Sequence, residues 1–152
     1  MNELREKLVE TALAWEKAFG NAPSITSALS EFDAALLVGC SVKVYANCMQ
    51  GKTAVQKGHD FVFNGARYQV KANRPSGKRG SFVTLVPKAS NYEWDFLVWV
   101  LYNPQYEIQE AWLWDRDKYI AAFDSLKRLS PDLYRKGKML YSCETGCSAA
   151  IL

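Results

Sequence analysis

The dipeptide Asn64-Gly65 stands between residues 60–63 and residues 66–71, and apolar and polar side chains alternate along the second of these segments. A two-residue alternation is typical of β-strands, and Asn-Gly is the preferred dipeptide of the type I′ turn that joins two antiparallel strands. The sequence therefore predicts a tight β-hairpin. Such a turn restricts the fold strongly, because it fixes which residues face each other across the two strands.

In this hairpin Asp60 lies opposite Gln69, and Lys71 lies two residues further along the same face. The other face receives the apolar side chains, which are Phe61, Phe63, Tyr68 and Val70. We therefore expect one face to be buried in the core. The other face should hold a carboxylate, a carboxamide and an ammonium group together.

The rest of the chain contains both helical and strand-like patterns. We expect an amphipathic helix over residues 2–19, with Leu4, Leu8, Ala12, Trp15 and Phe19 on one face. A second helix begins at Pro23-Ser24 and buries Ile25, Ala28, Leu29, Phe32 and Leu36, while residues 41–47 form either its last turns or a short strand. Further strands are expected at residues 81–86, 95–102 and 108–114, followed by a helix from Asp115 to Ser130-Pro131. The predicted fold is one α/β domain over residues 1–152, with a central mixed sheet flanked by helices.

Positive charge is concentrated in the middle of the chain. Residues 51–90 contain eight Lys and Arg residues and one acid, Asp60, whereas the net charge of all 152 residues is only +3. Such a concentration is typical of proteins that bind polyanions. With 49% hydrophobic and 23% charged residues the chain is not of the disordered class. No apolar run reaches the ~18 residues of a membrane span and the N terminus lacks a secretory pattern, so we expect a cytoplasmic protein without membrane contact.

The polar groups of the hairpin suit metal-assisted hydrolysis of a phosphodiester. Mg²⁺ prefers oxygen ligands, which the Asp60 carboxylate, the Gln69 side chain and the Val70 backbone carbonyl can supply. Lys71 can stabilise the negative charge that develops during the reaction. One carboxylate binds a divalent cation weakly, so we expect a second from the first helix, with Glu10 and Glu6 as the candidates.

Asp60 followed by Gln69-Val70-Lys71 across a hairpin, after a helix that carries glutamates, resembles the PD-(D/E)XK nuclease superfamily. The proline that usually precedes the aspartate is His59 here, and the usual glutamate is Gln69, as in the QxK branch of the superfamily. The resemblance implies a restriction-endonuclease-like core and a Mg²⁺-dependent site in which Asp60, Gln69, Lys71 and Glu10 are catalytic.

Over nearly its whole length the chain also resembles the homing endonucleases that group I introns encode. This resemblance implies site-specific cleavage of a long double-stranded DNA target. It also implies a homo-oligomer, at least a dimer, with a dimer of dimers as the larger alternative.

Polar and basic residues around and after Lys71 are expected to contact the DNA. Cations, hydrogen-bonding side chains and glycines there allow close approach to phosphates and to base edges. The main candidates are Arg67, Asn73, Arg74, Ser76, Lys78, Arg79 and Ser81, and the weaker ones are Lys52, Lys57, Arg135, Lys136 and Lys138.

Two other interpretations stay open. A DNA-binding protein of the same fold could have lost catalysis, with Gln69 as the mark of that loss. Alternatively, Cys143 and Cys147 are spaced like half of a zinc site, which Cys40 and Cys48 could complete in an interaction domain. Reduced thiols are the ordinary state of cysteines in the cytosol.

Overall fold

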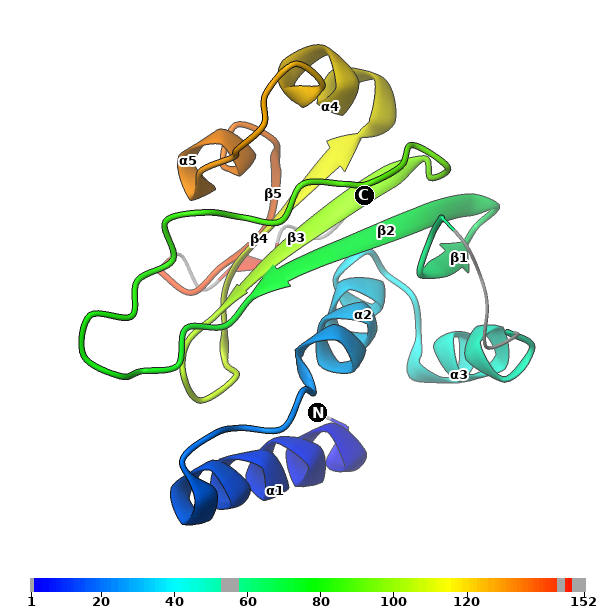
Figure 1. Cartoon of the computed structure of the whole chain (residues 1–152). Helices are drawn as coiled ribbons and strands as arrows, with labels where there is room; N and C mark the ends of the chain where they lie inside the picture. The colour runs from blue at the N-terminus through cyan, green and yellow to red at the C-terminus, as the bar shows by residue number, and fades with distance from the viewer. Residues whose placement is uncertain (1, 53–57, 145–146, 149–152) are drawn as a thin grey trace.

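The computed structural model describes residues 2–52, 58–144 and 147–148. Its centre is a six-stranded sheet in the order β1-β2-β3-β4-β5-β6, in which β2 and β3 are parallel and the other neighbours are antiparallel. The strands are β1 (Phe61–Phe63), β2 (Ala66–Asn73), β3 (Phe96–Tyr102), β4 (Ile108–Asp115), β5 (Lys138–Ser142) and β6 (Cys147–Ser148). The predicted class, α/β with a mixed sheet flanked by helices, is confirmed (Figure 1).

The hairpin has the register that its turn predicts. Phe61 lies opposite Tyr68, and Phe63 lies opposite Ala66. Both turn residues have positive φ, 51° at Asn64 and 77° at Gly65, as a type I′ turn requires. Asn and Gly tolerate this conformation better than other residues, which explains why the local sequence is sufficient to set the register.

Strand β3 lies at the centre of the sheet and is covered on both faces. Val98 and Val100 pack in a core with the hairpin, whereas Leu97 and Trp99 pack in a second core on the opposite face. All four side chains are fully buried. The nearly continuous apolar run of β3 follows from this double coverage.

The helices divide between the two faces of the sheet. Helices α1 (Glu3–Phe19), α2 (Thr26–Leu37) and α3 (Val42–Gln50) are associated with the first core, and α2 packs directly on β2. Helices α4 (Arg116–Phe123) and α5 (Pro131–Tyr134) lie on the second core. The long segment 74–95 crosses this second face and connects the parallel strands β2 and β3 (Figure 1).

The structure corrects several predicted elements. Residues 81–86 form no strand but an irregular segment with one β-bridge, Val86 to Leu129. Val83 and Val86 pack in the second core, whereas Phe82 and Leu85 are exposed. Residues 41–47 belong to a separate helix, α3. Helix α4 begins at the predicted cap Asp115 but ends at Phe123, and Pro131 opens α5 rather than ending α4.

A buried charge network fastens α1 to the body. Asp33 of α2 is 4% exposed and accepts hydrogen bonds from Arg5 Nε at 2.6 Å and from the Tyr102 hydroxyl at 2.6 Å. The apolar face predicted for α1 is nevertheless mostly exposed, because only Ala12 of its five residues is buried.

Helix α2 is also rotated from the prediction, with Leu29 buried but Ala28 and Leu36 exposed. None of the helices in the described ranges is long and apolar enough to cross a bilayer.

Candidate active site

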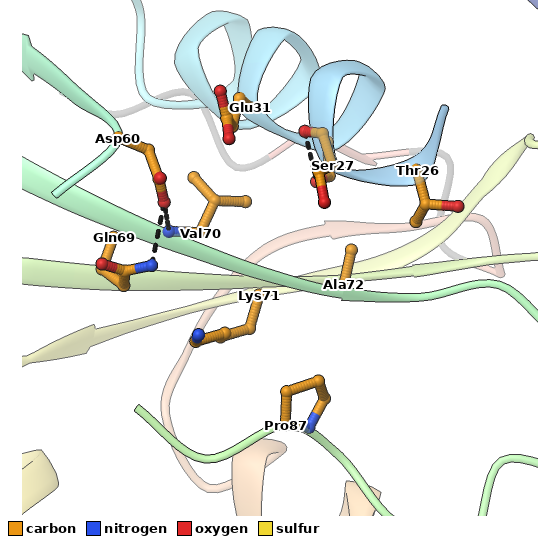
Figure 2. Close-up of a pocket in the computed structure, with 10 residues that line it drawn as sticks. Thr26, Ser27, Glu31, Asp60, Gln69, Val70, Lys71, Ala72 and Pro87 are labelled. Carbon is orange, nitrogen blue, oxygen red and sulfur yellow. Dashed lines mark hydrogen bonds between the residues drawn. The ribbon is translucent and has the colours of Figure 1, made fainter. Parts of the chain in front are cut away.

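The open edge of β2 is the feature that builds the site. Strand β1 pairs only with residues 66–68 of β2, so residues 69–73 pair with β3 on one side and leave their other side without a partner strand among the described residues. A cavity of about 350 Å³ lies along this edge. Its lining comes from α2 on one side and from Pro87 of the connecting segment on the other (Figure 2).

Asp60 is held in place by β2. Its carboxylate oxygen Oδ2 accepts a hydrogen bond from Gln69 Nε2 at 3.0 Å and from the Val70 backbone N–H at 2.7 Å. The Asp60 backbone is fixed as well, because its N–H donates to Tyr68 O and its carbonyl accepts from Lys52 Nζ. The predicted juxtaposition of Asp60 and Gln69 is therefore present in the structure.

The Val70 carbonyl is directed to the same edge. The N–H and C=O groups of one residue in a strand point to the same side. Because the Val70 N–H points at Asp60, the carbonyl oxygen faces the open edge and the cavity.

Glu31 of α2 is the second carboxylate of the cavity. Burial, together with the nearby negative charge of Asp60, raises the pKa of the Glu31 carboxyl to about 7, although Lys52 opposes the shift. In the part of the chain that the structure describes, Glu31 makes no hydrogen bond or ion pair. Two carboxylates that repel each other across a cavity are a typical binding site for a cation.

Lys71 lines the cavity from the other face of the sheet. Figure 2 shows its side chain on the Pro87 side of β2, whereas Glu31 lies on the α2 side. No described residue accepts a hydrogen bond from the Lys71 ammonium group or forms an ion pair with it. A half-buried cation without a protein partner is available to an anionic ligand at this edge.

The donor set fits Mg²⁺. Asp60 and Glu31 supply two carboxylates, and the Val70 carbonyl and Gln69 side chain add neutral oxygens, all of which are ligands that Mg²⁺ accepts. A cation would also relieve the repulsion that raises the pKa of Glu31. Within the described ranges no cluster of three or more His, Cys, Asp or Glu residues could hold a metal, so the site depends on these neutral oxygens.

The predicted helix glutamates are not in the cavity. Glu10 and Glu6 are exposed on α1, and neither lines the cavity. Helix α2 packs on β2 and occupies the position expected for the first helix, so the acid at the site is Glu31. The signal in the sequence was weak, because Glu31 is one of several polar residues of α2 and has no motif around it.

Three of the predicted DNA contacts have structural partners instead. The Arg74 side chain is 7% exposed, forms an ion pair with Glu16 at 2.8 Å and stacks on the ring of Tyr106. Asn73 accepts a hydrogen bond from Trp99 Nε1 and donates one to Leu85 O. Arg67 binds Asp95 through its side chain and its backbone N–H, so only part of its guanidinium is available.

Lys78 and Arg79 remain as exposed cations on the connecting segment. Ser76 and Ser81 shape this turn, since the Ser81 hydroxyl accepts from the Ser76 N–H and the Ser76 hydroxyl accepts from the Lys78 N–H. Among the weaker candidates, Lys52 donates a hydrogen bond to the Asp60 carbonyl at the site, and Arg135 forms an ion pair with Glu110. Lys136 and Lys138 are exposed, and Lys57 lies outside the described residues.

The zinc interpretation stays a prediction, because the side chain of Cys147 lies outside the part of the chain that the structure describes. Cys40, Cys48 and Cys143 are free cysteines. No protein-family model matches the sequence, and no curated protein matches it.

Proposed function

We propose that this protein is a divalent-metal-dependent endonuclease that hydrolyses phosphodiester bonds in double-stranded DNA. The observation that carries the proposal is the cavity at the open edge of β2. Asp60, before β1, and Glu31, on α2, supply two carboxylates to this cavity. Lys71 of β2 lines it as well, and no described residue forms an ion pair with its ammonium group. Positive charge stabilises a scissile phosphate. Lys71 supplies it directly, and the two carboxylates would supply it through a bound Mg²⁺.

Asp60, Glu31 and the Val70 carbonyl would hold the Mg²⁺, and the cation would polarise the phosphate. The hydrogen bond from Gln69 keeps the Asp60 carboxylate directed at the cavity, and Gln69 is itself a candidate ligand through its side-chain oxygen. The Lys71 ammonium would stabilise the negative charge that builds up on the phosphate oxygens during attack by water.

The surface beside the cavity supports DNA as the substrate. No acidic residue occurs between Asp60 and Glu93, so the connecting segment is neutral or basic from residue 74 to residue 92. Lys78 and Arg79 are exposed near Phe82, which is 82% exposed. Basic residues beside an exposed aromatic ring are typical of loops that bind phosphates and place an apolar side chain in contact with bases.

Site-specific cleavage of a long target, as in intron-encoded homing endonucleases, is the finer form of this proposal. A small domain with one site must act as at least a dimer to cut both strands, which agrees with the homo-oligomer implied by the resemblance.

The test is cleavage of supercoiled plasmid and of a randomised duplex library in Mg²⁺, with EDTA as the control. The parent should cut only with Mg²⁺. Lys71→Ala and Asp60→Asn should reduce the rate at least ~100-fold while DNA binding in Ca²⁺ persists.

Glu31→Gln and Glu10→Gln form the matched pair, because each removes one carboxylate from a helix near the N terminus. We expect Glu31→Gln to lose cleavage and Glu10→Gln to keep it. DNA binding without cleavage by the parent would favour the decayed DNA-binding protein. A parent that neither binds nor cuts DNA would overturn the proposal.

A further inference from the structure

Helix α1 presents an apolar stripe to solvent. Leu4, Leu8 and Trp15 are 77%, 40% and 53% exposed, and Phe19 is 68% exposed. With the exposed Thr11 and Ala18, the residues at positions 4, 8, 11, 15 and 18 follow the alternating four- and three-residue spacing of a coiled-coil seam, and Phe19 adjoins its end. We call Leu4, Leu8, Thr11, Trp15, Ala18 and Phe19 the α1 stripe.

Helix α1 contacts its own chain mainly through a neighbouring face, although Leu4 and Leu8 of the stripe also line a groove with residues of α2 and α3. That neighbouring face carries Arg5, which is bound to Asp33, and Glu16, which is bound to Arg74. Val9, Ala12 and Leu13 of the same face pack on the first core. Helix α1 is thus fixed at both ends and presents the stripe as a rigid surface.

The α1 stripe is complementary to itself. If two copies of α1 pack antiparallel about a twofold axis close to Thr11, Leu8 of one copy lies opposite Trp15 of the other. Leu4 then lies opposite Ala18 and Phe19, so a large side chain meets a small one and an aromatic edge. A twofold axis requires this kind of pairing, in which one patch contacts its own copy.

The area is of the size that a dimer needs. The four large side chains would together bury roughly 1,000 Å² over two copies, close to the lower end of stable interfaces. The apolar surface also continues past the helix, because Leu4 and Leu8 line a cavity of about 290 Å³ with Phe32 and Val42. Apolar patches larger than a few hundred Å² are uncommon on monomers.

We propose that the α1 stripe is a homodimer interface, in which α1 packs antiparallel against α1 of a second copy about an axis near Thr11. We assign a second copy as the partner because the order of large and small residues along the stripe is complementary to the same stripe running in the opposite direction. The proposal does not depend on nuclease activity, and it is tested without DNA.

Sedimentation equilibrium over a range of concentrations is the first test. The parent should be a dimer, and Leu8→Glu or Trp15→Glu should weaken dimerisation at least ~100-fold, because each buries a carboxylate in the interface. Val62→Glu, at an exposed apolar residue outside α1, is the matched control and should leave the dimer intact. Circular dichroism of each variant confirms that α1 and the sheet are folded.

Cross-linking tests the axis itself. When combined with Cys143→Ser and Cys147→Ser, Thr11→Cys should form a disulfide with its own copy under mild oxidation. Lys17→Cys, at an exposed residue about 120° around the helix from Thr11, should not. A monomeric parent, a dimer that Leu8→Glu and Trp15→Glu leave unchanged, or equal cross-linking at positions 11 and 17 would overturn the proposal.

Discussion

The surroundings of the Glu31 carboxyl group favour its neutral, protonated form. Burial and the charge of Asp60 raise its pKa from the ordinary value near 4.5 to about 7. The folded protein therefore binds this proton more tightly than the unfolded chain does. The stabilisation that comes from binding a proton at Glu31 is fully present below about pH 4.5, and it is lost as the pH rises through 7.

We predict that Glu31→Gln is more stable than the parent at pH 8 but not at pH 4.5. The expected gain at pH 8 is about 1–2 kcal/mol, which allows for the partial exposure of the side chain. Urea unfolding in EDTA at both pH values measures it. Glu10→Gln is the control and should show no pH-dependent difference, and the same result for Glu31→Gln would contradict the assigned pKa.

Substitutions of Gln69 test whether the Gln69 side chain is a metal ligand. Gln69→Glu replaces the amide that donates to Asp60 with a second negative oxygen. We expect it to lower the melting temperature in EDTA, to bind Mg²⁺ more tightly, and to keep part of the cleavage activity. Gln69→Leu should lose Mg²⁺-dependent cleavage and still fold. The measurement is the cleavage rate of both variants as a function of Mg²⁺ concentration. A fully active Gln69→Leu would show that the Gln69 side chain does not bind the metal.

At the scale of elements, the connecting segment 74–95 divides between anchoring and binding. Arg74 anchors it through Glu16, Tyr106 and the Pro104 carbonyl, whereas Lys78 and Arg79 are exposed. The two kinds of cation should therefore give different results on substitution.

Lys78→Ala with Arg79→Ala should flatten the salt dependence of DNA binding by about two units, close to 0.9 for each phosphate contact. Stability should not change. A titration of binding against salt concentration checks this, and an unchanged slope would show that the segment does not touch the DNA backbone.

Arg74→Ala should instead destabilise the fold by about 2–3 kcal/mol, because it leaves Glu16 and the Pro104 carbonyl without their cation. Denaturant unfolding measures the loss. A change in the salt slope of DNA binding with no loss of stability would return Arg74 to the set of phosphate contacts.

At the scale of the whole molecule, the proposed dimer has a consequence for the proposed reaction. Two sites on one dimer could cut both strands in one binding event, whereas a monomer cuts one. We predict that the parent converts supercoiled plasmid mainly to linear product and that Leu8→Glu gives mainly nicked circles. Gel electrophoresis over time separates the two products, and equal yields of linear product would show that double-strand cleavage does not require this interface.

Local patterns determined much of the molecule. The Asn64-Gly65 turn set the register of the hairpin, and thus the contact between Asp60 and Gln69, because both depend on neighbours in the sequence. The apolar run of β3 likewise indicated a central strand. Only the tertiary structure decided that Glu31 faces the cavity in place of Glu10, because two amphipathic helices compete for one face of the sheet. It also decided that Arg74 is an anchor, since its partner Glu16 lies 58 residues away and charge composition cannot reveal a distant pair.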